Sequence, residues 1–480
     1  MNRQNFLGHL ALALMLIVVA VFVGQVRRWD SKRDEAAGPR AVLEVKREET
    51  RRVVEAAEQS YELAEPEVLV RFREGVSEDR VKEIVAARYD RVEDEIEEVG
   101  GLVSIDSLDN EDAAQVVADY SSLPEVEYVE ANEQISLSPL NSEGVEEVFA
   151  APLPGGPNDP LLADQWALIN TGQREGKDRA DISALDAWAR THGSRKVVVA
   201  VLDSGVDYTH QDLSENMWVR PDSLAPYVDE QLGEVDDEHG FSALDADRDP
   251  MDENGHGTHC AGIVGAVGDN GEGIAGVNWE VEIMPLKFMG SGGFGTTKDA
   301  IEAINYVIAR KKAGVNVRVI SASWGSRTKS RALGDVIRKA GEEGILFVAA
   351  AGNNNENADR FPHYPSGYDL PNVMSIAALN RRDERASFSN WGPKSVHLAA
   401  PGAEILSTWL GGQYEEHSGT SMATPVVSGV AALVLSVEPN LSVAELKKRL
   451  MDTSDKLDSL QGVIASGGRV NAARAVGATK

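Results

Sequence analysis

Four apolar runs separated by helical stretches constrain the fold of this chain more than any other feature of its sequence. Each run is a nearly unbroken series of Val, Ile, Leu and Ala, without the alternation of apolar and polar residues that a half-exposed strand shows. Helical segments lie between the runs, as over 297–313 and 331–343. Strands of this kind predict a mostly parallel sheet that is buried on both faces by helices. The four runs are residues 196–202, 281–286, 317–321 and 345–350.

Composition excludes several classes of protein. The chain has 480 residues, 42% of them hydrophobic, which supports a real core and excludes a fully disordered chain or a fibre. Its 77 acidic and 47 basic residues give a net charge of −30, which argues against nucleic acid or an anionic membrane as the main partner. A single cysteine, Cys260, excludes an intrachain disulfide and a multi-cysteine metal site. If the protein is exported, calcium bound in acidic loops is the first alternative to consider for stabilisation.

The N-terminal segment predicts export. Residues 10–23 are almost all apolar, which is the length of a secretory signal and short for a membrane span. Arg27 and Arg28 follow, and such bases favour the cytoplasmic side of a membrane, which is a mild objection to export. We predict that no other stretch of the sequence is long and apolar enough to span a membrane. We therefore predict that residues 1–26 are a signal peptide or an uncleaved membrane anchor. Residues 27–61 form a charged linker without a predicted chemical role.

Residues 62–137 predict a small α+β domain of the ferredoxin-like type. The predicted order is β-α-β-α-β, and the span from Glu62 to Glu133 holds 22 acidic and 6 basic residues, a net charge of −16. An independent binding module and a pro-domain both fit this pattern. The Pro- and Gly-rich residues 138–157 then predict an exposed linker that is easily nicked, so a second domain covers 158–480. The predicted elements are strands at 67–72, 101–105 and 126–129, and helices that begin at Ser77 and Asp112.

Three polar motifs lie where a parallel sheet would place a ligand. Asp203 ends the first apolar run, His256 opens a helix rich in small residues, and Ser421 precedes the apolar helix 426–434. Each has an ordinary alternative when taken alone. Asp203 fits a strand-end turn, Ser421 fits a helix cap, and the histidines His256 and His259 fit structural roles or, with Cys260, a metal site. The metal site lacks the further ligand pattern that it needs.

Together, the motifs occur in the chain order Asp203, His256, Ser421. The blocks DSG, HGTH and GTSMATP around these residues resemble the three signatures of the subtilisin-like serine peptidases, in their thermitase-like branch. The resemblance covers 158–480, and residues 62–137 resemble the inhibitor-type propeptide of the family. It implies an α/β, three-layer subtilisin-like domain and a self-processing serine endopeptidase. In this interpretation Asp203 orients His256, His256 is the general base, and Ser421 is the nucleophile.

The resemblance also implies the groups around the reacting bond. Asn353 would donate to the oxyanion; Asn354 and Asn355 are alternatives of register, and the preceding Gly352 favours Asn353. Substrate would bind as an added strand. His363 stands at the expected floor of the S1 pocket, although a histidine in an ordinary surface loop would fit the sequence as well. The family pattern is loose at this position, so we predict no preference for the P1 residue of the substrate. The remaining substrate-binding residues are Ser323, Trp324 and Gly325 and Ala350, Ala351 and Gly352 as pocket walls, and Gly290 and Gly292 in an edge strand.

Calcium is the predicted cofactor. The loop 244–252 has carboxylates at alternate positions, which suits a hard cation, although a solvated acidic loop has the same pattern. A second site is implied by the family resemblance alone, and in it Glu272 is a departure from the family pattern. The predicted ligands are Asp245, Asp247, Asp249 and Asp252 in the loop, and Asp159, Asp212, Val267, Asn270, Glu272 and Ile274 in the second site.

We therefore predict a secreted, calcium-stabilised serine endopeptidase that acts as a monomer on polypeptides and carries its own propeptide as an inhibitor. Cys260 is predicted to be a buried structural thiol. A protease anchored at the cell surface or in the periplasm differs only in keeping residues 1–26. A catalytically silent protein of the same fold, used for binding, is the alternative function. No nucleic acid partner is expected.

Overall fold

The computed structural model describes residues 67–108, 112–137, 156–229, 233–244 and 248–478. The predicted leader and charged linker, residues 1–61, lie outside the described residues, as does nearly all of the predicted linker 138–157. Glu65–Lys480 form one compact unit. Within it, a small N-terminal lobe (67–137) precedes a large sheet domain (156–478).

The N-terminal lobe is a four-stranded antiparallel sheet with two helices, in the order β-α-β-β-α-β and the strand order β2-β3-β1-β4 of a ferredoxin-like fold. The predicted order missed one strand, Asp90–Glu95, because its sequence DRVEDE has a single apolar residue. Ser77 and Asp112 cap the two helices as predicted. The elements are β1 (Glu67–Phe72), α3 (Glu78–Ala86), β2 (Asp90–Glu95), β3 (Leu102–Ser107), α4 (Ala113–Ser121) and β4 (Val126–Ala131).

The large domain is built on a nine-stranded sheet in the order β18-β19-β15-β14-β13-β12-β6-β10-β9. All neighbouring strands pair in parallel except β18 and β19. The four predicted runs are β6, β10, β12 and β13, at the centre of the sheet. The strands are β6 (Gly193–Asp203), β9 (Phe241–Ser242), β10 (Glu280–Lys287), β12 (Val317–Ala322), β13 (Leu346–Ala350), β14 (Val373–Leu379), β15 (Leu398–Pro401), β18 (Asp455–Lys456) and β19 (Gly468–Arg469).

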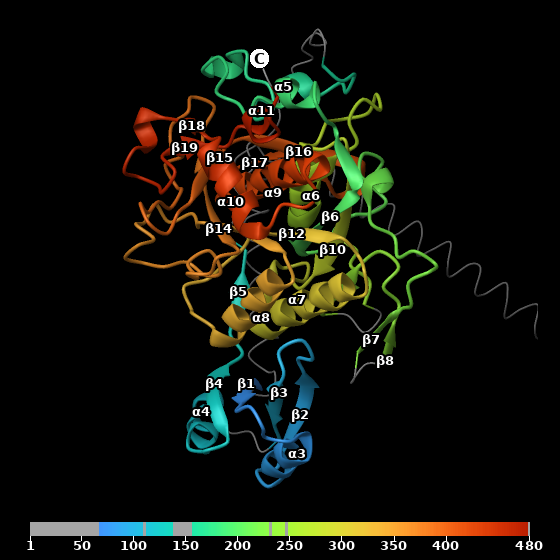
Figure 1. The fold of residues 1–480 in the computed structure, drawn as a ribbon, viewed down its shortest axis with the longest axis vertical. Helices are drawn as coiled ribbons and strands as arrows, with labels where there is room; N and C mark the ends of the chain where they lie inside the picture. The colour runs from blue at the N-terminus through green and yellow to red at the C-terminus, as the bar shows by residue number, and fades with distance from the viewer. Residues whose placement is uncertain (1–66, 109–111, 138–155, 230–232, 245–247, 479–480) are drawn as a thin grey trace, which may run out of the picture. The chain divides into compact units, whose positions relative to one another are not determined.

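Helices cover both faces of this sheet (Figure 1). Successive residues of β6 point to opposite faces, so Val199 and Val201 pack in the core on the α6 and α9 side, while Ala200 and Leu202 pack on the α7 and α8 side. Among the described residues, α9 is the one helix long and apolar enough to cross a membrane, but 89% of it is buried in the fold. The helices are α6 (His256–Gly265), α7 (Thr297–Lys312), α8 (Arg331–Glu342), α9 (Thr420–Val437) and α10 (Val443–Asp452).

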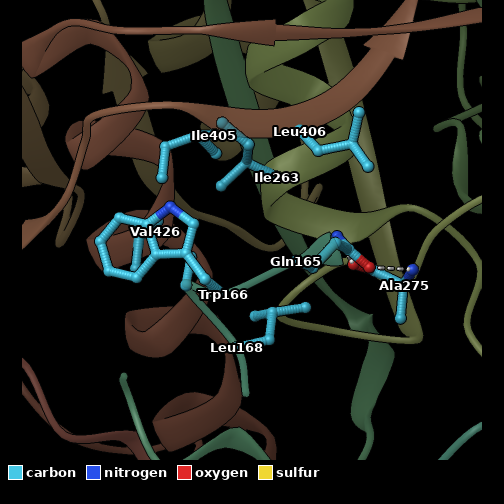
Figure 2. Close-up of a pocket in the computed structure, with 9 residues that line it drawn as sticks. Gln165, Trp166, Leu168, Ile263, Ala275, Ile405, Leu406 and Val426 are labelled. Atoms are coloured by element: carbon cyan, nitrogen blue, oxygen red, sulfur yellow. Dashed lines mark hydrogen bonds between the residues drawn. The ribbon is translucent and has the colours of Figure 1, made fainter. Parts of the chain in front are cut away.

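A small internal cavity lies on the α6 and α9 side of the sheet (Figure 2). Apolar side chains such as Trp166 and Ile263 line it, and Gln165 closes one side through two hydrogen bonds to the backbone of Ala275. None of the three motif residues lines this cavity. It is therefore a packing feature of the core.

The lobe continues directly onto the large domain. Its last strand, β5 (Gln134–Ser136), pairs antiparallel with β11 (Phe294–Thr296), and the Leu137 N–H then donates to the carbonyl oxygen of Gly293 (2.9 Å). Apolar residues of the lobe, including Ile96 and Tyr128, share one core cluster with α7 and α8. β5 and β11 therefore form a two-stranded sheet of their own, which joins the lobe to the large domain.

Candidate active site

Asp203 and His256 meet at the carboxyl edge of the sheet. Asp203 is the last residue of β6, and His256 is the first residue of α6. The Nδ1 atom of His256 lies 2.7 Å from Oδ1 of Asp203, which also accepts a hydrogen bond from the Ser204 N–H (2.8 Å). Both side chains are buried, at 1% and 0% exposure. The contact fixes the imidazole with a proton on Nδ1 and leaves Nε2 to act on a third group.

Two opposing effects set the basicity of His256. Burial lowers the pKa of the imidazole, whereas the charge and hydrogen bond of Asp203, together with the charge of Asp252, raise it. The net result is a raised pKa. The site therefore stabilises the imidazolium that forms when His256 accepts a proton.

Ser421 lies at the start of α9 and is buried, with 6% exposure. Its Oγ donates to the carbonyl oxygen of Ser323 (2.8 Å) rather than to His256.

The thiol of Cys260 lies beside these residues. Its Sγ is 3.6 Å from the Ser421 carbonyl oxygen, and the thiol group lies close to both Asp203 and His256. Burial raises the pKa of the Cys260 thiol well above its usual value, so this cysteine is a poor nucleophile.

Asn353 is oriented toward the loop before Ser421. Its Oδ1 accepts two hydrogen bonds from Thr420, one from the backbone N–H and one from Oγ1, both 2.9 Å long. With the oxygen occupied, the Nδ2 group is the donor left to act, and it lies 3.5 Å from the position that a Cβ of Gly419 would take. The backbone N–H of Asn354 instead donates to Oδ1 of Asn390 (3.1 Å), which separates Asn354 from this arrangement.

The two predicted pocket walls lie on either side of an imidazole ring. A Cβ on Gly325 would be 2.3 Å from Cε1 of His363, and a Cβ on Gly352 would be 3.0 Å from its Cδ2. His363 is 9% exposed and bonds to the backbone of Ala350, and among the described residues its Nδ1 has no hydrogen-bond partner. Burial lowers the pKa of His363 to about 4, so the ring is neutral near pH 7. The space between the walls is therefore occupied by a neutral ring.

The predicted edge strand is displaced along the chain. Gly290 and Gly292 belong to a tight turn in which the Gly293 N–H donates to the Gly290 carbonyl oxygen (2.9 Å). The residues that pair with an incoming strand are Phe294–Thr296, four residues after Gly290. Glycine at 295 permits this contact, because a Cβ there would be 1.8 Å from the carbonyl oxygen of Phe288.

The second predicted calcium site brings two buried carboxylates together. Asp159 and Asp212 have 5% and 0% exposure, and neither carboxylate forms an ion pair with a described residue. Burial raises the pKa of Asp212 to about 6, opposed by hydrogen bonds from the Ile274 N–H (2.9 Å) and the Asn270 amide (2.9 Å). Loop 267–274 wraps around both carboxylates, and the Val267 N–H bonds to the Asp212 backbone. These oxygens suit a hard cation such as calcium.

The other predicted loop is less suited to calcium. Asp245 and Asp247 lie outside the described residues, and Asp249 accepts hydrogen bonds from Tyr208 and from the Met251 N–H. Both oxygens of Asp252 are occupied by protein donors, which argues against its predicted role as a ligand. The five donors are the Ser204 hydroxyl, the backbone N–H groups of Asn254, Gly255 and Thr258, and the Thr258 hydroxyl.

Asp252 has a different function in the fold, which sequence reasoning missed. Through Ser204 it holds the turn after Asp203, and through Thr258 it holds the first turn of the helix that begins at His256. The Ser204 hydroxyl in turn accepts a hydrogen bond from the Gly257 N–H (3.0 Å). Asp252 is therefore a positioning residue for the Asp203–His256 contact. The only signal in the sequence was an acidic residue shortly before the His256 motif.

Comparisons with known proteins all point to one family. A model described as the subtilase family matches residues 194–471. Thermitase of Thermoactinomyces vulgaris is 34% identical over 320 residues, which cover 67% of this chain and 99% of thermitase. Subtilisin-like protease 2 of Plasmodium falciparum is 34% identical over 304 residues, but the match spans only 22% of that protein. A solved protease from Pseudoalteromonas arctica superposes with a TM-score of 0.55 and 29% identity, covering 67% of this chain and 98% of the other.

Proposed function

This chain belongs to the subtilase family, and we propose that it is a serine endopeptidase that cuts polypeptides through Ser421, His256 and Asp203. The buried contact of 2.7 Å between His256 and Asp203, close to the start of α9, is the observation that carries the proposal. Hydrolysis of an unstructured protein such as casein, and its loss on Ser421→Ala, tests it.

The first half of the reaction forms an acyl-enzyme. Ser421 turns its hydroxyl from the Ser323 carbonyl toward Nε2 of His256, which takes the proton as Oγ attacks the scissile carbonyl carbon. Asp203 keeps the other proton on Nδ1 and stabilises the resulting imidazolium. The carbon–nitrogen bond then breaks, and the leaving amine takes the proton from Nε2.

The second half repeats the same steps with water. His256 removes a proton from the water, whose oxygen attacks the acyl carbon, and Ser421 leaves with that proton. Both tetrahedral intermediates carry a negative oxygen. The backbone N–H of Ser421 and the Nδ2 group of Asn353 would donate to it, since the Asn353 oxygen is already held by Thr420.

Replacing Asn353 by alanine is expected to lower kcat by about 10²–10³ with little change in KM, because the lost donor acts on the oxyanion rather than on the bound substrate. Steady-state kinetics on one peptide amide check this. Asn354→Ala is a suitable control, because its side chain has no bond to Thr420. Equal losses in the two variants would contradict the assignment.

Substrate would bind as an antiparallel strand along β11, as β5 of the chain itself does. The neutral ring of His363 between Gly325 and Gly352 leaves little depth for a P1 side chain. We therefore propose a preference for small P1 residues such as alanine.

His363→Ala is expected to raise kcat/KM for peptides with P1 phenylalanine by about 10–10², since space for several carbon atoms opens between the walls. Cleavage of matched peptides with P1 alanine provides the internal control and should change far less. Unchanged discrimination between the two peptides would rule out His363 as the pocket floor.

The N-terminal lobe would act as an intramolecular inhibitor and make the chain a zymogen. Its last strand occupies the edge that a substrate would use, and its apolar residues share a core cluster with α7 and α8. Cleavage in the 138–157 linker would separate the two parts.

We further propose that the mature protein is a monomer that acts on polypeptides without a nucleic acid partner. Export, or anchoring at the cell surface or in the periplasm, rests on the leader in residues 1–26.

Calcium would stabilise the mature domain at Asp159 and Asp212, the buried pair described above. A cation bound only by the folded state adds about 2.7 kcal/mol at one hundred times its Kd. Chelation should therefore lower the Tm of the wild-type chain, and Asp212→Asn should remove most of that dependence. Thermal unfolding with calcium and with EDTA measures both effects. An identical response to EDTA in the two proteins would contradict the site.

A further inference from the structure

Several acids of the lobe meet a base or an N–H donor of the large domain. Glu98 forms an ion pair with Lys312, and the Glu130 carboxylate accepts a hydrogen bond from the Arg331 N–H (2.8 Å). Such pairing is the expected way to seat an acidic lobe, because each negative group finds a positive partner. One contact departs from this pattern, because in it an acid of the lobe meets an acid of the large domain.

The exception joins Asp94 of β2 in the lobe to Glu302 of α7 in the large domain. The two side chains form a hydrogen bond to each other, and an oxygen of each lies within 4.8 Å of the other. The residues are 6% and 7% exposed, so water does not separate them. Ionised carboxylates only accept hydrogen bonds, so a bond between the two groups requires a proton on one of them.

The other oxygens of the pair indicate which group carries the proton. Oδ1 of Asp94 accepts a hydrogen bond from the Glu95 N–H (3.0 Å). Oε1 of Glu302 is buried and has no hydrogen-bond partner among the described residues. An unpaired oxygen costs less free energy in a neutral carboxylic acid than in a buried carboxylate. The geometry therefore favours Glu302 as the donor and Asp94 as the ionised acceptor.

The groups that face the pair favour the same assignment. Burial raises the pKa of Asp94, and burial together with the hydrogen bond to Asp94 raises the pKa of Glu302 well above its usual value. Lys298 opposes these effects, but it also forms an ion pair with Glu93. The titratable neighbours, taken by element, are Glu93 of β2, Lys298 of α7, and Asp229 and Tyr227 of β7 (Tyr227–Asp229).

We propose that Asp94 and Glu302 share one proton across the boundary between the lobe and the large domain, and that this proton makes the seating of the lobe sensitive to pH. When the proton leaves to water, two buried carboxylates face each other, and their repulsion weakens the contact. A glutamic acid in the unfolded chain loses its proton near its ordinary pKa of 4.5, whereas Glu302 keeps its proton to higher pH. The stability that the contact adds is therefore complete below that ordinary value and is lost as the pH rises through the raised pKa of Glu302.

The shared proton would give the lobe a regulated hold on the large domain. If the lobe is the inhibitor proposed above, a rise in pH would loosen it and favour the active enzyme, whereas a lower pH would keep the zymogen closed. That consequence rests on the proposed function. The shared proton itself does not, because it depends only on the contact between Asp94 and Glu302.

The test uses the full chain with Ser421→Ala, so that no processing occurs, and compares it with the same chain carrying Glu302→Gln. Glutamine keeps the size of the side chain and offers Asp94 an amide N–H that does not titrate. The Tm of the variant should match that of the parent near about pH 5 and exceed it by about 2–4 °C near about pH 9. Asp94→Asn, made from the lobe side, should show the same growing difference.

Infrared difference spectroscopy reports the proton directly, because a protonated carboxyl group and a carboxylate absorb at different frequencies. At neutral pH the parent should show a carboxylic acid band that Glu302→Gln lacks. Glu98→Gln is the matched control, since Glu98 joins the lobe to α7 through Lys312 and needs no proton to do so. It should change the Tm by a similar amount at every pH and leave the acid band in place.

The proposal is overturned if the Tm curves of the parent and Glu302→Gln run parallel from about pH 5 to about pH 9, or if the acid band is the same in both proteins. Should Glu302→Gln fail to fold, Asp94→Asn provides the same two comparisons. Neither measurement uses hydrolysis, so failure of the endopeptidase proposal would leave this result readable.

Discussion

Ser421→Ala is expected to lower kcat on polypeptides by about 10⁶, the largest effect of any single substitution in this chain. The variant lacks the oxygen that attacks the scissile carbonyl, so only binding and the oxyanion donors remain to accelerate the reaction. Folding should be preserved. The Ser421 hydroxyl donates only to the Ser323 carbonyl oxygen, and alanine keeps the Cβ in the first turn of α9.

Two measurements check this prediction in the full chain. Casein hydrolysis reports the activity, and gel electrophoresis with N-terminal sequencing reports processing. The wild type should lose its leading region and gain a new N-terminus within 138–157, whereas Ser421→Ala should stay intact. Ser418→Ala is the matched control, since Ser418 is in the same loop and its Oγ accepts a hydrogen bond from the Glu404 N–H (2.8 Å).

The contrary outcome is also informative. If wild type and Ser421→Ala both stay intact and neither cuts casein, the endopeptidase proposal fails, and the catalytically silent binding protein takes its place. If the wild type cuts casein without processing itself, another protease performs the maturation. Loss of activity in Ser418→Ala as well would point to a disturbed loop rather than to a missing nucleophile.

The sequence was sufficient to predict the parts of the fold that depend on local pattern. The continuous apolar runs became β6, β10, β12 and β13, because a strand buried on both faces has no polar positions. The edge of the sheet was not predicted. β15 has only four residues and is held by its neighbour β14, so its pairing depends on segments far away in the chain.

The site was predictable where one motif carries one chemical role. Asp203 and His256 could be expected to meet, because the strand that ends at Asp203 and the helix that begins at His256 were both expected at the same edge of a parallel sheet. The contacts of Asp252 were not accessible, because an acidic loop near a helix suits both a cation and backbone donors, and only the fold shows five donors around it. The contact between Asp94 of β2 and Glu302 of α7 was equally hidden, because 207 residues lie between them in the sequence.

Asp203→Asn is expected to lower kcat by about 10⁴ with a small change in KM. Oδ1 of Asp203 receives hydrogen bonds from His256 and from the Ser204 N–H, while Oδ2 has no hydrogen-bond partner in the part of the chain that the structure describes. In the variant, an amide group facing His256 would donate to Nδ1 and so force the imidazole proton onto Nε2. That tautomer cannot accept the proton of Ser421.

The pH profile separates this loss of function from simple unfolding. His256 is a base only when neutral, so activity rises as pH increases through its pKa. Because the charge of Asp203 raises that pKa, the acid limb of kcat/KM should move to lower pH in Asp203→Asn. Asp207→Asn is the control, because it removes a nearby carboxylate that contacts Thr209 rather than His256. It should change neither kcat nor the position of the acid limb of kcat/KM appreciably. A variant Asp203→Asn with nearly wild-type kcat, or with its acid limb at higher pH, would contradict the role of Asp203.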